Sequence, residues 1–173
     1  MNLVLIGFKA SGKTTLGSRL ATLLGKKYID TDALVEKIYQ EGNNQKLSCR
    51  EIFTKIGEKN FRLLEELALF RMRSRENLVI ATGGGIVRVR DAATLLRAIG
   101  HVVFLNASES LLEKRLDFVQ TPLFANGNWR TLHAERSPLY KEAAHTVVGV
   151  ESNESPEELA RRVARCMGLY NVM

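Results

Sequence analysis

Residues 7–14 read Gly-Phe-Lys-Ala-Ser-Gly-Lys-Thr and set the architecture of the whole chain. They match the pattern G-x-x-x-x-G-K-[ST] and directly follow the apolar run Leu3-Val4-Leu5-Ile6, which has the composition of a buried strand. In such a loop the glycines let successive backbone N–H groups point at nucleotide phosphates, Lys13 adds charge at the β and γ oxygens, and the Thr14 hydroxyl is a magnesium ligand. The alternative is a glycine turn that binds nothing.

The composition favours one domain in a reducing compartment. The chain has 173 residues, 45% of them hydrophobic, with no linker, repeat or low-complexity segment. Cys49 and Cys166 lie far apart and show no metal-ligand spacing, so neither a disulfide framework nor a zinc site is expected. The apolar residues 1–6 lack a basic leader and are much shorter than a membrane span. We therefore expect a soluble, cytoplasmic protein with no membrane partner.

The net charge of +6 suits an enzyme with anionic substrates, and the same charge is compatible with nucleic-acid binding. Two arginine groups do not separate these interpretations, since basic residues near helix C-termini are usually solvated. These groups are Arg71, Arg73 and Arg75, and Arg161, Arg162 and Arg165. No heptad repeat or large exposed apolar stripe stands out, so a monomer is the default. We expect no nucleic-acid partner.

Strands and helices alternate along the chain. Strands are predicted at 2–6, 28–30, 78–81, 101–105 and 145–150, and helices at 13–24, 32–41, 48–75 (in pieces), 91–99, 108–117, 131–143 and after Ser155. Ser48 and Ser155 are each followed three residues later by glutamate, which predicts capping boxes. Continuous apolar strands between amphipathic helices indicate an α/β fold with a parallel sheet covered on both faces, and ligands at the carboxyl ends of its strands.

Two carboxylates, Asp30 and Asp32, end the second predicted strand. Residues two apart on an extended backbone face the same side, so both can lie beside the magnesium and the acceptor hydroxyl. The alternative is that one of them caps the following helix. The apolar strand 78–81 runs into Thr82 and glycines without an acidic residue, so the carboxylate must come from elsewhere. We expect Asp30 to hold the metal through water and Asp32 to orient or deprotonate the attacking hydroxyl.

Three further features are candidates for binding the acceptor. Gly83-Gly84-Gly85 removes side chains where a substrate can approach backbone N–H groups, although glycine turns after strands are common. Arg62 has Glu58 and Glu66 four residues before and after it, so spacing alone favours ion pairs on a helix surface. Arg136 could bind a carboxylate through its planar fork or be an ordinary solvated arginine.

Together these motifs resemble those of the shikimate kinases. The resemblance rests on residues 7–14, Asp30-Thr31-Asp32, Ile52-Phe53 with Gly57-Glu58 and Phe61-Arg62, Gly83-Gly84-Gly85, and Arg136-Ser137-Pro138-Leu139-Tyr140, in the family's order and approximate spacing over nearly the whole chain. It implies a P-loop NTPase fold of the nucleoside-monophosphate-kinase type, with a five-stranded parallel sheet of order 2-3-1-4-5. It also implies ATP-dependent phosphorylation of the 3-hydroxyl of shikimate, a step of aromatic amino-acid biosynthesis.

The resemblance also implies roles for individual residues. ATP would be bound by Gly7, Ser11, Gly12, Lys13, Thr14, Thr15 and Arg115, shikimate by Asp32, Arg62, Gly83, Gly84, Gly85 and Arg136, and Mg²⁺ by Thr14 and, through water, Asp30. Lys13 and Asp32 would be catalytic. Residues 1–31, 76–117 and 131–173 would form the core of a single domain, about 32–62 the substrate-binding module, and about 118–130 a lid over ATP.

One departure from the family pattern concerns the lid. Family lids usually carry an arginine directly before Pro-Leu, where this chain has Thr121 before Pro122. Charge on the transferring phosphoryl group is worth orders of magnitude in rate, so another cation is expected to substitute. Arg130 is the candidate, as the only lysine or arginine between Arg115 and Arg136. Lys114 is the alternative to Arg115 as the residue near adenine.

Two other functions remain open at this point. The same fold serves small-molecule kinases acting on gluconate or nucleoside monophosphates, although Arg62 and Arg136 favour an acceptor with a carboxylate. The threonine in the lid suggests a nucleotide-binding pseudo-kinase, although Lys13, Thr14 and both aspartates are present. No guanine-recognition motif of the N-K-x-D type occurs, which argues against a GTPase switch.

Overall fold

The computed structural model describes residues 1–116, 128–151 and 154–169. Its strands are β1 (Leu3–Ile6), β2 (Lys27–Asp30), β3 (Leu78–Ala81), β4 (His101–Ala107) and β5 (Thr146–Val150). Its helices are α1 (Lys13–Leu23), α2 (Thr31–Asn43), α3 (Cys49–Met72), α4 (Ala92–Ile99), α5 (Glu109–Leu116), α6 (Trp129–Ala143) and α7 (Pro156–Cys166), with a 3₁₀ turn η1 (Ile86–Arg88).

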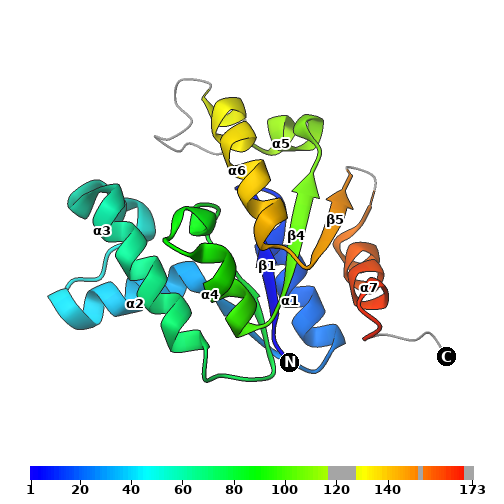
Figure 1. The fold of residues 1–173 in the computed structure, drawn as a ribbon, viewed down its shortest axis with the longest axis horizontal. Coiled ribbons are helices and arrows are strands. Elements are labelled where there is room, and N and C mark those ends of the chain that lie inside the picture. The colour runs from blue at the N-terminus through cyan, green and yellow to red at the C-terminus, as the bar shows by residue number, and fades with distance from the viewer. Residues whose placement is uncertain (117–127, 152–153, 170–173) are drawn as a thin grey trace.

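The five strands form one parallel sheet of order β2-β3-β1-β4-β5, as expected (Figure 1). The central strand β1 pairs with β3 and β4, with Leu3 opposite Val79 on one side and His101 on the other. All four residues of β1 are buried, which explains its continuous apolar sequence. The phosphate loop therefore leaves the middle of the sheet.

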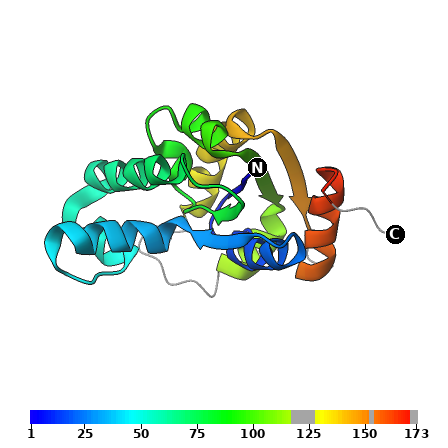
Figure 2. The same cartoon turned by 90° about the horizontal axis from the view of Figure 1, so that it is seen from below.

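Helices cover both faces of this sheet. Figure 2 shows α1 and α7 together on one face and α4 and α6 on the other, while α2 and α3 extend beyond the β2 edge. The main core lies between these layers. A second, smaller cluster fills the space between α2 and α3 and consists of Val35, Ile38, Tyr39, Ile52, Phe61 and Ala68.

The structure refines several predicted boundaries. Helix α6 begins at Trp129, two residues earlier than predicted, and β4 continues to Ala107. The capping boxes at Ser48 and Ser155 are both present. The predicted helical pieces at 48–75 form α3, which is interrupted by Gly57 at φ 77° and ψ 167°. Among the described residues, no helix combines the length and apolarity needed to cross a membrane.

Candidate active site

A pocket of about 1130 Å³ opens where β1, β2 and β3 end. It brings together nearly all of the residues expected to bind substrates: Ser11, Gly12, Lys13, Thr14, Thr15, Asp30, Asp32, Arg62, Gly83, Gly84, Gly85, Arg115 and Arg136. Gly7 is the exception, because it does not line the pocket. Its role is in the backbone of the loop.

The phosphate loop depends on glycine at two positions. Gly7 has φ 149°, and a Cβ there would lie 2.7 Å from the carbonyl oxygen of Leu105. Gly12 has φ 98° and directly precedes the first turn of α1. Ala10 also has a positive φ, 64°, which is uncommon for a residue with a side chain. The loop thus turns back over the N-terminus of α1, where backbone N–H groups favour anions.

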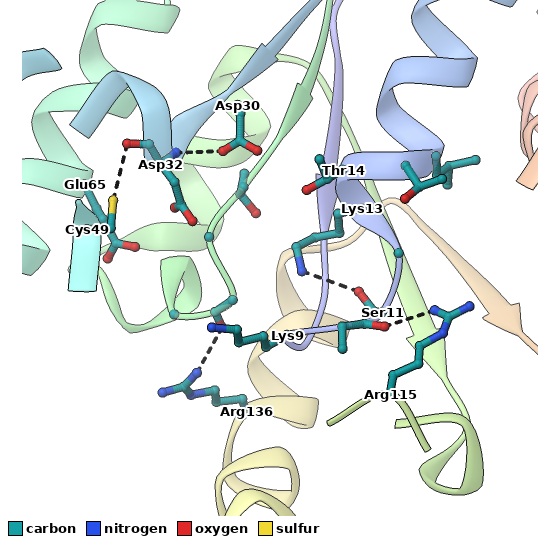
Figure 3. A pocket seen from close by; sticks show the side chains of 18 of the residues that line it. Lys9, Ser11, Lys13, Thr14, Asp30, Asp32, Cys49, Glu65, Arg115 and Arg136 are labelled. Atoms are coloured by element: carbon teal, nitrogen blue, oxygen red, sulfur yellow. Dashed lines mark hydrogen bonds between the residues drawn. The ribbon is translucent and has the colours of Figure 1, made fainter. Parts of the chain in front are cut away.

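Lys13 folds back onto this loop. Its ammonium donates to the carbonyl oxygens of Gly7 and Phe8, both at 2.8 Å, and contacts Oγ of Ser11 at 3.4 Å. Burial lowers the pKa of Lys13 to about 8, against the opposing attraction of Asp32 and Asp30. The side chain is thus held inside the cradle that phosphates would enter (Figure 3).

Asp30 caps α2, so the capping alternative is correct for this residue. Its Oδ1 accepts the N–H of Asp32 at 2.9 Å, and the hydroxyl of Tyr28 lies 3.3 Å from its Oδ2. Capping does not remove the carboxylate from the pocket, because Asp30 also lines it. The cap therefore leaves the carboxylate of Asp30 beside the pocket, and its role toward magnesium stays a prediction.

Asp32 also lines the pocket, beside Gly83 and Glu65. A Cβ on Gly83 would be 2.6 Å from Oδ1 of Asp32 and 3.2 Å from Oε1 of Glu65, so a side chain at 83 would displace both carboxylates. Burial, and then the charge of Asp30, raise the pKa of Asp32 above its ordinary value. A carboxylate with a raised pKa is a stronger base toward a hydroxyl proton.

Arg62 forms two ion pairs, although one of them is not the predicted pair. Its guanidinium lies 3.1 Å from Glu58, as expected, and 2.6 Å from Glu65 rather than Glu66. The Arg62 side chain is only 14% exposed, and its Nε is buried without a hydrogen-bond partner among the described residues. The interpretation of Arg62 as a solvated surface arginine is therefore wrong.

Arg136 is buried as well, so the solvated alternative is also wrong for this residue. Its Nη1 donates to the carbonyl oxygen of Gly84 at 3.2 Å, and the Tyr140 hydroxyl donates to the same oxygen. Its Nε, like that of Arg62, has no partner in the part of the chain that the structure describes. One buried and one partly buried guanidinium group, each with a buried Nε that donates to no described residue, thus flank the triple-glycine turn.

The sequence also matches one known protein family along most of its length. The family model of shikimate kinase matches residues 9–168. The chain belongs to the shikimate kinase family.

Relatives in this family are similar over almost the full length. The shikimate kinase of Helicobacter hepaticus is 37% identical over 171 residues, covering 96% of this chain and 95% of that protein. That of Caldanaerobacter subterraneus is 38% identical and covers 95% and 94%. The structure of Acinetobacter baumannii shikimate kinase in complex with shikimate has a TM-score of 0.83 at 34% identity, covering 96% of this chain and 92% of that one.

Magnesium, which the shikimate kinase resemblance implies, fits the oxygen donors at the loop. Thr14 is exposed in the first turn of α1 and lines the same pocket as Asp30. Hydroxyl and carboxylate oxygens are the donors that Mg²⁺ prefers, and it usually keeps several waters beside a few protein ligands. The described residues contain no cluster of three His, Cys, Asp or Glu side chains that would form a protein cage. Such a site would rely on phosphate oxygens as further ligands.

The basic residues on either side of the predicted lid occupy different places. Arg115 lines the pocket and donates from Nη1 to the carbonyl oxygen of Ala10 at 3.0 Å, whereas Lys114 is not among the lining residues. Arg130 pairs with Glu113, and its guanidinium lies 4.5 Å from the centre of the Trp129 ring, outside the pocket lining. Thr121 lies outside the described residues, as does most of the predicted lid.

Sequence reasoning missed four charged residues that line this pocket, namely Lys9, Arg50, Glu65 and Glu154. Glu65 is 2% exposed and joins Arg62 to the Asp32 side of the pocket, and burial raises its pKa against the opposing charge of Arg62. The spacing of three residues from Arg62 was its only signal. Lys9 lines the pocket from within the phosphate loop itself, where the motif allows any residue.

Proposed function

We propose that this chain transfers the γ-phosphoryl group of ATP to the 3-hydroxyl of shikimate, and that Asp32, Arg62, Arg136 and the triple glycine bind the acceptor. One observation carries this assignment: the buried Arg136 and the partly buried Arg62, each with a buried Nε that has no partner among the described residues, lie in the same pocket as a phosphate loop. Guanidinium groups bind carboxylates through paired hydrogen bonds. An acceptor that carries both a carboxylate and hydroxyl groups suits this arrangement better than a neutral sugar.

In this proposal, each of these residues has its own role in the phosphoryl transfer. The acceptor oxygen attacks the γ-phosphorus, the bond from phosphorus to the bridging oxygen of ADP breaks, and the hydroxyl proton passes to the carboxylate of Asp32. Lys13 supplies positive charge to the phosphates inside the loop. Thr14 and, through water, Asp30 would hold magnesium, which neutralises charge on the β and γ phosphates when it is bound.

The remaining assignments belong to the same proposal. Gly7, Ser11, Gly12 and Thr15 would support the phosphates, and Arg115 rather than Lys114 would lie near adenine, since it lines the pocket. Residues of about 32–62 would form a substrate-binding module, and about 118–130 a lid over ATP. The protein would act as a cytoplasmic monomer that binds neither membrane nor nucleic acid.

Phosphorylation of shikimate by the purified protein with ATP and magnesium tests this function directly. Asp32→Ala and Arg62→Ala variants and an assay without acceptor serve as controls for the site and for ATP hydrolysis. We expect shikimate-dependent ADP formation by the unmodified protein and its loss in both variants. Turnover with gluconate or a nucleoside monophosphate but not with shikimate would reject the substrate, and ATP binding without turnover on any acceptor would favour a pseudo-kinase.

A further inference from the structure

Lys9 lies where the phosphate loop meets the triple-glycine turn. A Cβ on Gly84 would be 3.1 Å from the backbone nitrogen of Lys9, so the two segments are in contact at this point. The side chain is exposed and lines the pocket. Figure 3 shows it extending from the phosphate loop toward the side of the pocket that holds Arg136. Lys9 therefore stands at the junction of the nucleotide and acceptor halves of the pocket.

The charge of Lys9 acts on both halves. Its ammonium stabilises the charged form of Asp32, which opposes the rise that burial causes in the pKa of that group, and it disfavours the charged form of Lys13, which adds slightly to the fall in the pKa of Lys13. The γ-phosphorus must pass between Lys13 and the oxygen that Asp32 activates.

Four other cations that line this pocket already have partners. Lys13 donates to loop carbonyls, Arg62 pairs with glutamates, and Arg115 and Arg136 donate to backbone carbonyls. No described residue forms an ion pair or hydrogen bond with the ammonium of Lys9. A lysine on a flexible four-carbon stem can follow a moving group as a point charge.

We propose that Lys9 is a catalytic residue, which contacts an equatorial oxygen of the transferring phosphoryl group as it passes from ADP to the acceptor. This inference rests on the proposed function. Lys9 stays protonated throughout and forms no covalent bond, so the bonds made and broken are those already described. Its effect is electrostatic, since negative charge spreads over the equatorial oxygens in the transition state. It would supply the charge that a threonine before Pro122 cannot supply, and unlike Arg130 it lines the pocket.

A Lys9→Met variant tests this role, because methionine keeps most of the side-chain volume and removes the charge. Lys9→Arg restores a cation, and Lys141→Met removes an exposed lysine outside the pocket as a matched control. We expect Lys9→Met to lower kcat roughly 10- to 100-fold, with KM for ATP and shikimate changed by less than about 3-fold. Lys9→Arg should recover most of the loss, and Lys141→Met should match the unmodified protein.

Binding of a transition-state mimic gives a second readout, which a merely structural role would not move selectively. Lys9→Met should weaken binding of ADP with aluminium fluoride and shikimate by about the same factor as kcat, while the affinity for ADP alone is unchanged. The proposal would be overturned if Lys9→Met left kcat unchanged, or if it weakened the binding of ADP and of the mimic by the same factor. It would also be overturned if Arg130→Ala lost turnover while Lys9→Met kept it. If the unmodified protein did not phosphorylate shikimate, the proposed function itself would fail, which is a distinguishable result.

Discussion

At the scale of single residues, burial disfavours the charged form of Lys13 in the ligand-free pocket. The carbonyl oxygens around Lys13 compensate only in part for lost water, so its pKa is lowered to about 8. Phosphates in the loop would raise this pKa again, because they favour the ammonium form. Lys13 would therefore be partly neutral above pH 8 in the free protein and protonated in the complex.

Proton uptake on ADP binding follows from this difference. At pH 8.5 we expect ADP to bind with the uptake of a substantial fraction of one proton, and at pH 6.5 this contribution should vanish because Lys13 is already protonated. Calorimetry in buffers of different ionisation enthalpy measures the uptake. Lys13→Arg keeps a permanent charge and is the control. Equal uptake by Lys13→Arg at pH 8.5 would assign the proton to another group.

Arg136 allows a separate test of carboxylate recognition. Arg136→Lys keeps the charge but loses the fork that lies against Gly84. We expect KM for shikimate to rise roughly 10- to 100-fold, about 1.4 to 2.7 kcal/mol, with KM for ATP nearly unchanged. Steady-state kinetics measure both. Arg88→Lys, an exposed arginine 3.8 Å from Glu135, is the matched control, and an equal effect there would remove the specific role of Arg136.

The candidate site was predictable from sequence where a motif restricts the residue type, as for Lys13, Thr14 and the triple glycine. It was not predictable where the role of a residue depends on whether the fold buries its side chain. The spacing of Arg62 allowed an exposed ion pair as readily as a buried guanidinium, because both have glutamates one turn away. Glu65 and Lys9 remained hidden for the same reason, since neither position is distinguished in the chain until the fold places it at the pocket.

At the scale of elements, α3 owes its bend to one glycine. Gly57 has φ 77° and ψ 167°, a backbone region that is almost restricted to glycine, and the bend separates the capped first turns from the segment that carries Arg62. The sequence indicated helical pieces across 48–75 but not this bend, because a glycine inside a helix often keeps helical geometry. Buried strands and capping boxes were easier to predict, since their signals lie in adjacent residues.

Substitution of Gly57 should therefore affect both stability and acceptor binding. We expect Gly57→Ala to lower the free energy of unfolding by roughly 1–3 kcal/mol and to raise KM for shikimate, because the strained backbone shifts Arg62. Thermal denaturation and kinetics measure these effects. Gly42→Ala, in α2 with no positive φ and open space around a Cβ, should be neutral or stabilising. Similar losses in the two variants would contradict a special role for the bend.

At the scale of the whole molecule, the division of the core favours independent movement of the proposed substrate-binding module. The cluster around Val35, Ile52 and Phe61 holds α2 against α3, whereas the main core joins the sheet to its covering helices. The smaller cluster buries few side chains, so opening this part of the fold should cost less free energy than unfolding the sheet. Asp32 and Arg62 belong to this part, so opening would also disrupt the acceptor site.

Hydrogen exchange can measure this hierarchy. In the free protein, amides of α2 should exchange faster than those of β1, whose residues are all buried. Shikimate at about 100 times its Kd should slow α2 exchange roughly 100-fold, because every opening that breaks the acceptor site must first release the ligand. Amides that open without disturbing the site, such as those at the exposed end of α7, serve as the control and should not change. If α2 and β1 exchanged at one common rate in the free protein, the module would not open separately. The acceptor site would then be disrupted only when the whole fold opens.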